Sequence, residues 1–366
     1  MSLTNRQLFF FVFLFTIPFV TSMLPKMMAD SFGTGAWIYL TAASLFYSVF
    51  AGIIAYLGFS NRGKTLFEYS RPLVGKFLTY CFSLIYFVNF FIYTSTTARS
   101  MAEIIHAEVM VNTPRWVVMA VTLAAAGYAV SKGLTNLGRI FEIMGILILT
   151  VSIFTRFLTI AQGDVLNLLP VMDIAEPKKY VSMVPSSLFL FSGFELMTII
   201  PFTKRNGTKV MGTAVFTVLF IGFFYIFATE TTYMILGVDD CSNYNYPLFT
   251  AVRRIDVNAL QFLKRGDLIF IITWITEAFC NLSIILFATV EYARKMLAKQ
   301  GSNFVLAAIG ILAFAAGLLP SSAAMAESLA LHTSFYLSGF TMITIPLIFF
   351  ITQKVKNHEK NISEQP

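Results

Sequence analysis

An acidic side chain and a glycine stand in the middle of an otherwise apolar stretch, SLFLFSGFELMTIIPF, at residues 187–202. Such a stretch predicts a membrane helix, in which every backbone N–H and C=O needs a partner. A break at Ser192 and Gly193 would free some of these groups. Freed N–H groups at the start of a half-helix attract an anion, and freed carbonyls attract an ammonium group. The stretch therefore predicts a site for a small zwitterion, with Glu195 either bracing the break or contacting a cationic group.

A second interruption is predicted in FTIPFVTSMLP, at residues 15–25, where Pro18 and Pro25 flank Thr21 and Ser22. Proline removes a backbone donor and disrupts the preceding helical turn. A simple kink also explains either segment taken alone. Two interrupted segments at matching places in the two halves of a chain favour a transporter-type binding site near the membrane midplane.

Ionisable residues inside apolar runs cost roughly 2.5–3.5 kcal/mol each on insertion scales, so each needs a partner or a cavity. Arg99 and Glu103 lie four residues apart on one helix face and are expected to pair. Glu230 and Glu277 are candidates either for buried contacts between helices or for a polar pathway.

Polar side chains also recur at helical spacing. Tyr93 and Thr97 lie four residues apart, and Trp274, Glu277 and Asn281 follow one stripe of WITEAFCNLSIILF at 274–287. Such a stripe in a membrane helix faces protein or water. Hydrogen bonding between helices explains it as readily as contact with a ligand.

Residue patterns for metal-dependent or nucleophilic catalysis do not occur in the sequence. The three histidines lack ligand spacing, and there is no GxxxxGK[ST] loop, no HExxH and no Ser-His-Asp order. We therefore expect no enzymatic activity, no metal site and no cofactor.

The composition is that of a polytopic membrane protein. Of the 366 residues, 57% are hydrophobic and 12% are charged, whereas soluble domains have about 45–50% and about 25%. Each apolar run of about 20 residues predicts one membrane-spanning helix. We predict an all-α integral membrane fold with ten spans, at about 6–30, 34–59, 77–106, 115–131, 139–160, 182–203, 210–236, 267–292, 303–319 and 333–352.

Basic residues in the loops predict the orientation of these spans. With the N-terminus inside, sixteen Lys and Arg residues fall on the cytoplasmic side and nine on the outer side, so both termini are expected inside. The net charge of +7 is thus a topology signal and does not indicate nucleic-acid binding. Residues 1–366 are expected to form one transmembrane domain of two five-helix repeats, 1–161 and 182–353, joined by the loop 161–181. The odd number of spans in each repeat makes the second inverted, and the first span of each is expected to be broken.

Six patterns follow one another along this frame: TSMLPKMMADSFGTGAWI (21–38), TLFEYSRPLVGK (65–76), ARSMAEII (98–105), GLTNLGRIFEI (133–143), FSGFELMTIIPF (191–202) and KRGDLIFIITWI (264–275). With these six patterns in this order, the chain resembles the spore germination receptor B subunit family, also called the spore permease family. That family is part of the amino acid–polyamine–organocation transporter superfamily. The resemblance covers about residues 5–355.

The resemblance implies a LeuT-like fold in the inner membrane of a bacterial spore, with a pocket between broken helices 1 and 6. It implies two protein partners, a receptor A subunit and a lipoprotein C subunit. Binding of a small germinant, such as an amino acid, would trigger germination. By matching position, the pocket would draw on Phe19, Val20, Thr21, Ser22, Tyr93, Thr97, Ser192, Gly193, Phe194, Glu195, Cys280 and Asn281.

One departure from the family concerns the first interruption, where relatives have glycines and this chain has PFV at 18–20. The bulk of Phe19 and Val20 predicts a smaller or reshaped pocket. A proton- or sodium-coupled amino acid or amine transporter is the alternative function. The absence of Lys, Asp and Glu between 143 and 155 disfavours proton coupling there, whereas Thr21, Ser22 and Ser283 leave sodium coupling open. A structural membrane scaffold would explain neither interruption.

Overall fold

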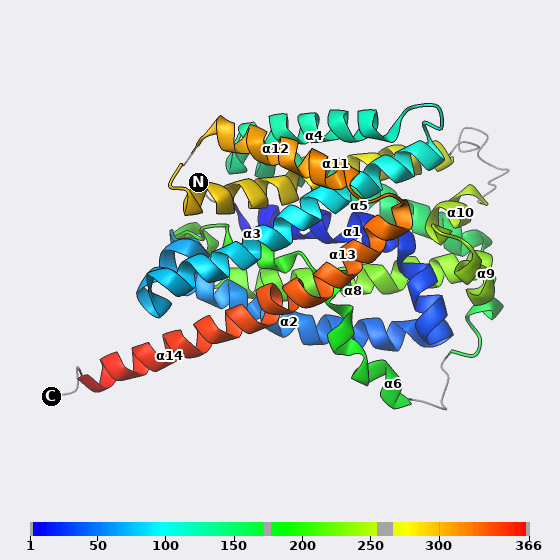
Figure 1. The fold of residues 1–366 in the computed structure, drawn as a ribbon. Helices are drawn as coiled ribbons and strands as arrows, with labels where there is room; N and C mark the ends of the chain where they lie inside the picture. Colours follow the sequence, from blue (N-terminus) through cyan, green and yellow to red (C-terminus); the bar gives the residue numbers. More distant parts are fainter. Residues whose placement is uncertain (1–2, 172–176, 255–265, 300, 364–366) are drawn as a thin grey trace.

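The computed structural model describes residues 3–171, 177–254, 266–299 and 301–363, and within these ranges it contains helices and no β-strand. The longer helices form one bundle, with both termini at the same end (Figure 1). The predicted all-α fold is thereby confirmed. Parts of the predicted connection 161–181 and the start of the pattern at 264–275 lie outside the described residues.

Five long helices make up the first half of the chain. They are α1 (Asn5–Phe32), α2 (Ala36–Ser60), α3 (Leu66–Glu108), α4 (Arg115–Ser131) and α5 (Leu134–Gln162), with the short turn η1 (Gly33–Gly35) between the first two. α3 begins before the predicted span because a short leading helix is continuous with it. The two parts meet at a kink at Gly75, whose φ of 85° is not helical.

The second half is more broken up. Short turns η2 (Val165–Leu168) and α6 (Pro177–Ser182) lead into the sixth span, which consists of η3 (Val184–Ser187), α7 (Leu188–Phe191) and η4 (Phe194–Thr198). Then come η5 (Lys204–Asn206), α8 (Lys209–Leu236), α9 (Val238–Asn243), α10 (Pro247–Arg253), α11 (Gly266–Met296) and α12 (Asn303–Leu318). The last span comprises α13 (Ala323–Ser338), the π-helical turn η7 (Gly339–Thr344) and α14 (Ile345–Ser363).

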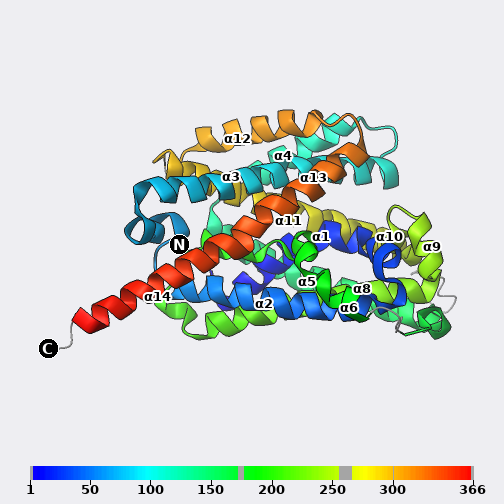
Figure 2. The same cartoon turned by 60° about the horizontal axis from the view of Figure 1, so that its bottom comes forward.

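Six stretches in the described part of the chain are helical, long and apolar enough to cross a bilayer, and the first of them, 5–60, contains both α1 and α2. The apolar helices α4 and α12 are shorter. Together with the interrupted sixth span, these elements correspond to the ten predicted spans. An even number of crossings agrees with the two termini lying at one end of the bundle (Figures 1 and 2).

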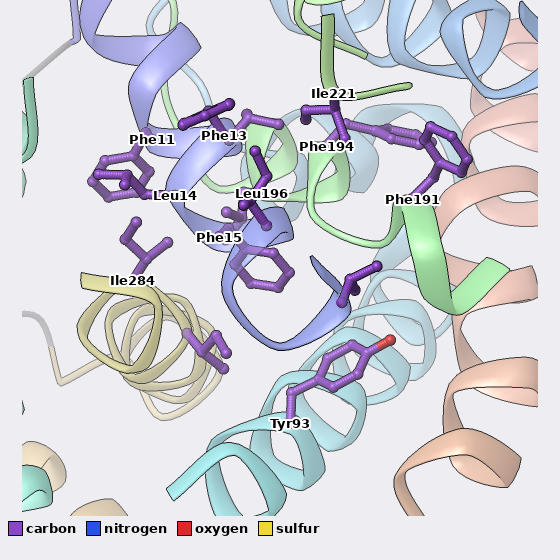
Figure 3. Close-up of a cluster of buried hydrophobic side chains, with 14 of the residues drawn as sticks. Phe11, Phe13, Leu14, Phe15, Tyr93, Phe191, Phe194, Leu196, Ile221 and Ile284 are labelled. Carbon is purple, nitrogen blue, oxygen red and sulfur yellow. The ribbon is translucent and has the colours of Figure 1, made fainter. Parts of the chain in front are cut away.

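α1 lies in the centre of the bundle, where it packs against α5, α8 and α11 (Figure 2). Lipid is as apolar as the side chains, so membrane helices associate through close packing and hydrogen bonds rather than through burial. Small residues allow this packing: a Cβ on Gly145 of α5 would lie 2.3 Å from Phe10 Cδ1 of α1. Aromatic and aliphatic side chains of α1 and the sixth span fill the space between the two (Figure 3).

The predicted break in the first span is wrong, because α1 is one continuous helix that contains both Pro18 and Pro25. Carbonyl groups around the two prolines receive additional donors, which are side chains of α8 and α11. These hydrogen bonds run from Asn281 Nδ2 to Phe15 O, from Tyr225 OH to Thr16 O, from Trp274 Nε1 to Pro18 O and from Tyr233 OH to Pro25 O. The carbonyls that Pro18 and Pro25 deprive of a helical donor are those four residues earlier, Leu14 O and Thr21 O, so these four bonds join the proline-containing part of α1 to its neighbours without replacing the missing donors.

α3 holds the π-helical turn of the last span in place. Tyr86 OH donates to Thr341 O at 2.6 Å, and Asn89 Nδ2 donates to Thr341 Oγ1 at 3.4 Å. Tyr93 OH lies 2.9 Å from Ser338 Oγ, at the end of α13. Because π turns leave backbone groups in unusual positions, these side chains fix a segment that is otherwise irregular.

Candidate functional site

The sixth span is broken at Ser192 and Gly193, as predicted. Gly193 has a φ of 142°, which a residue with a Cβ rarely adopts. A Cβ at this position would lie 2.2 Å from Thr16 Oγ1 and 2.7 Å from Phe15 Cδ1. α1 therefore passes directly against the bare backbone of the break, which only a glycine permits.

Glu195 holds the break together from within. Its side chain is fully buried; Oε1 accepts from the Ser192 hydroxyl at 2.7 Å, and Oε2 accepts from the Gly193 N–H at 2.6 Å. Hydrogen bonds to a charged group contribute about 1.5–3 kcal/mol. Of the two roles left open by the sequence, bracing the break is the one that this geometry supports.

Tyrosine and threonine side chains tie the broken span to its neighbours. The hydroxyl of Tyr225 on α8 lies 3.0 Å from Thr16 O and 2.7 Å from Leu190 O, so it joins α1, α7 and α8. Thr198 Oγ1 lies 2.7 Å from Tyr292 OH on α11. The two half-helices are thus fixed against helices that are themselves intact.

A cavity of about 90 Å³ lies beside the break. Since a water needs about 10–15 Å³ on this scale, the cavity has room for several waters or one small solute. It is lined by Phe15, Thr16, Phe19, Val20, Met23, Met27, Tyr93, Thr96, Thr97, Ser100, Glu103, Ile104, Phe189, Ser192, Tyr246, Asn281, Ile285 and Ala326. Most of these side chains come from α1 and α3, and Figure 3 shows Phe15 and Tyr93 facing the space between them.

Half of the predicted binding residues line this cavity: Phe19, Val20, Tyr93, Thr97, Ser192 and Asn281. The others, Thr21, Ser22, Gly193, Phe194, Glu195 and Cys280, are not part of its wall. The Thr21 and Ser22 hydroxyls donate to carbonyls of their own helix, at 3.0 Å and 2.7 Å. Phe194 belongs to the apolar cluster of Figure 3, and Cys280 is buried. Ligand binding by the twelve residues stays a prediction.

Phe19 lies where its bulk narrows the cavity, as predicted from the sequence. Its ring packs edge-on against Trp274, with 5.7 Å between the ring centroids, and it lines the cavity together with Val20. A glycine at either position would leave this part of the wall open.

The end of the cavity nearest the break is rich in hydrogen-bond acceptors. Asn281 Oδ1 is buried and has no hydrogen-bond partner among the described residues. The hydroxyl protons of Ser192 and Thr16 are directed to Glu195 and to Val12 O, so their oxygens keep lone pairs for a further donor. This end suits a group that donates several hydrogen bonds, such as an ammonium.

Several residues that line the cavity were not predicted to do so from the sequence. Thr96, Ser100 and Glu103 follow Tyr93 and Thr97 at helical spacing, so extending that face of α3 would have identified them. Tyr246 and Ala326 come from segments far away in the sequence, and no local pattern marks them.

The expected pairing of Arg99 with Glu103 is confirmed, with Nη2 2.7 Å from Oε1. Arg115, at the start of α4, adds an unforeseen second pair, with Nε 2.7 Å from Glu103 Oε2. Glu277 and Arg156 of α5 are both buried. Glu230 Oε1 has no hydrogen-bond partner in the described part of the chain.

Apolar helices around a central cavity, with one span broken beside it, are the arrangement of the LeuT-like fold. The crystal structure of MhsT in complex with L-phenylalanine is similar, with a TM-score of 0.69 at 13% identity over 95% of this chain and 88% of that one. Mhp1, a nucleobase-cation-symport-1 family transporter in a closed conformation with bromovinylhydantoin bound, gives a TM-score of 0.56 at 11% identity over 93% and 77%. At these identities the likeness establishes the fold alone.

Within this class, the chain belongs to the family of spore germination proteins, whose family model matches residues 2–324. Spore germination protein KB of Bacillus subtilis (strain 168) is 24% identical over 376 residues, 98% of this chain and 97% of the relative. Spore germination protein YndE of the same strain is 26% identical over 259 residues, 69% of each chain. GerQB of Bacillus cereus is 21% identical over 310 residues, 83% of each. The chain is thus a membrane protein of the spore germination family.

Proposed function

We propose that this protein is the transporter-like subunit of a spore germinant receptor, which binds a small solute in the cavity beside the broken sixth span. The observation that carries the proposal is the acceptor-rich end of the cavity, at Asn281, Ser192 and Thr16. It suits the ammonium group of an amino acid or a similar small germinant. Family membership supports the biological process, and the LeuT-like fold supports a ligand site near the centre of the membrane.

The proposed setting is the inner membrane of the spore, with both termini on the core side as the distribution of basic residues predicts. The relatives are spore germination proteins, which supports a multi-subunit receptor. We propose that the partners are a receptor A subunit and a lipoprotein C subunit.

The first experiment is germination of spores that lack the gene, followed as loss of optical density across a panel of amino acids, sugars and salts. Loss of the response to particular solutes, with normal vegetative growth on them, is the expected result. Normal germination together with impaired solute uptake would contradict the receptor function.

A cavity-filling variant then tests the site. Thr97→Phe places a ring in the cavity and is expected to abolish the response that the deletion removes. Thr150→Phe is the matched control, because Thr150 is exposed on α5 and far from the cavity wall. Equal responses of the two variants would show that the cavity does not bind the germinant.

A coupled amino acid or amine transporter is the second candidate, favoured by the buried ionisable side chains of Arg156 on α5 and Glu277 on α11. Arg156 Nε and Nη1 have no hydrogen-bond partner within the described ranges. The hydroxyl groups proposed for sodium coupling, on Thr21, Ser22 and Ser283, donate to carbonyls of their own helices. Uptake of radiolabelled amino acids by vesicles with purified protein, with and without a proton gradient, separates this function from the receptor function.

A further inference from the structure

The break in the sixth span has its anion position filled by the chain itself. The sequence predicts N–H groups there for an anion and carbonyls for an ammonium group. In the structure, Glu195 Oε2 accepts the Gly193 N–H at 2.6 Å, and the Leu196 N–H donates to Gly193 O at 3.1 Å. Because Glu195 is fully buried at this place, these N–H groups are not available to the carboxylate of a ligand.

The rest of the cavity wall also lacks a partner for a carboxylate. α1 is a continuous helix, and N–H groups inside a helix donate to carbonyls four residues earlier. Among the lining residues that the structure describes, none is a lysine, arginine or histidine, and Glu103 is the only charged one. Its carboxylate oxygens each lie 2.7 Å from an arginine, Arg99 or Arg115. A ligand carboxylate would face only neutral hydroxyl and amide donors, and burying an unpaired charge is costly.

Acceptors for an ammonium group, by contrast, lie close together beside the break. Asn281 is 3% exposed, and its Oδ1 has no hydrogen-bond partner within the described ranges. Its Nδ2 donates to Phe15 O, which places it next to Thr16. A Cβ on Gly193 would clash with Thr16 Oγ1, which places Thr16 next to the break. Asn281 Oδ1, Thr16 Oγ1 and Ser192 Oγ thus provide three acceptors, as many as the donors of one ammonium group.

The carboxylate of Glu195 is one hydroxyl group away from the cavity. Ser192 lines the cavity, and its Oγ donates to Glu195 Oε1 at 2.7 Å. An ammonium group that donates to Ser192 Oγ would complete a chain from the cation through the hydroxyl to the carboxylate. Linked hydrogen bonds of this kind strengthen one another in an interior of low dielectric constant. Glu195 therefore provides the counter-charge for a cation that it does not touch.

We propose that the cavity selects a small amine that has no carboxylate, in preference to an amino acid. Its ammonium group binds at Asn281, Ser192 and Thr16, and its carbon chain lies along apolar lining residues such as Val20 and Met23. That such an amine acts as a germinant rests on the proposed function. Binding of the amine does not, and it is tested on the purified full-length protein.

Ethylamine is the probe, because it is L-alanine with hydrogen in place of the carboxylate. L-Alaninamide keeps the ammonium group and replaces the carboxylate with a neutral amide, propionate keeps only the carboxylate, and potassium chloride supplies an inorganic cation. Thermal unfolding of the protein in a non-ionic detergent is followed during each titration, at constant ionic strength and neutral pH. We expect a saturable rise of the unfolding midpoint with ethylamine and L-alaninamide, and none with L-alanine, propionate or potassium chloride.

Three results would overturn the proposal. A rise with L-alanine as large as that with ethylamine would show that the cavity accepts a carboxylate. An equal rise with potassium chloride would show a site for inorganic cations. The absence of a saturable effect of ethylamine would show that the acceptors do not bind an ammonium group.

A pair of threonine variants locates the effect. Thr16→Val removes one acceptor and keeps a side chain of similar shape, so the apparent dissociation constant for ethylamine should rise about tenfold. Thr217→Val is the matched control, because Thr217 is buried on α8 and does not line the cavity. Both hydroxyls donate to the carbonyl four residues earlier in their own helix. Equal dissociation constants in the two variants would contradict binding of the ammonium group at Thr16.

Spores that lack the gene separate this proposal from the proposed function. If they germinate normally, the receptor function fails, while ethylamine binding by the purified protein still stands. If they lose the response to L-alanine, and L-alanine stabilises the purified protein as strongly as ethylamine does, the receptor function stands and the selection against a carboxylate fails.

Discussion

The first and sixth spans both contain residues that interrupt helices, yet they differ in what satisfies their backbone. α1 contains two prolines and stays helical, and side chains of α8 and α11 donate to carbonyls near Pro18. The sixth span contains Ser192 and Gly193 and separates into two pieces, which Glu195 caps from within. The break coincides with a glycine at a φ of 142° and with an acid that accepts its N–H, whereas the prolines of α1 lie inside a continuous helix.

The largest effect is expected from Gly193→Ala, because the new Cβ would clash with Thr16 Oγ1 and Phe15 and would require a positive φ. Strain and overpacking each cost about 1–3 kcal/mol, so loss of about 3–5 kcal/mol of stability is expected, with little folded protein. The yield of monodisperse protein and its unfolding midpoint measure this. Gly212→Ala is the control, since a Cβ there meets nothing within 4 Å. A Gly193→Ala protein as stable as the control would mean that α1 does not contact the break.

Glu195→Gln is expected to have the next largest effect. An amide offers one acceptor oxygen, whereas Ser192 Oγ and Gly193 N each donate to a separate oxygen. One donor then faces an NH₂ group, so the free energy of unfolding should fall by about 1.5–3 kcal/mol. Thermal unfolding provides the measurement, and Glu230→Gln is the matched variant because Glu230 Oε1 has no hydrogen bond to lose. If the two variants are equally stable, Glu195 is not the cap.

Tyr225→Phe tests a side chain that joins both spans, because its hydroxyl reaches Thr16 O and Leu190 O. Hydrogen bonds between membrane helices contribute about 0.6–1.7 kcal/mol, so a loss of about 1 kcal/mol is expected. Hydrogen exchange of the residues at 188–198 should increase, which a purely local role on α8 would not produce. Tyr128→Phe, at an exposed position of α4, should change neither quantity.

The smallest effect is expected from Ser22→Ala. Its hydroxyl donates only to Phe19 O of the same helix, and such bonds contribute little to helix stability. We expect the free energy of unfolding to change by no more than about 0.5 kcal/mol. The germination response should be independent of sodium in this variant, as in the unchanged protein. A sodium-dependent response that disappears in this variant would support the sodium coupling that the sequence left open.

The number and order of the spans could be predicted because apolar runs and loop charges are local signals. The break at Ser192 and Gly193 was predicted for the same reason, since a glycine and an acid stand out in an apolar run. The contacts around Pro18 were not predictable, because Trp274 and Asn281, which donate to Pro18 O and Phe15 O, lie more than 250 residues away. The two ion pairs of Glu103 illustrate both cases: the spacing of Arg99 and Glu103 revealed one pair, but nothing in the sequence joins Arg115 to it.

The π-helical turn at Gly339–Thr344 has a consequence for mapping the last span. A turn closed by i→i+5 hydrogen bonds holds one residue more than an α-helical turn, and one residue corresponds to about 100° of rotation about the axis. One side of α13 faces α3. The residues of α14 that lie on this same side are therefore shifted by one sequence position from those expected in an uninterrupted helix. A single helical wheel drawn through 323–363 would assign lipid-facing and protein-facing positions incorrectly beyond Thr344. Scanning mutagenesis of the last span therefore needs one wheel for α13 and a second wheel for α14.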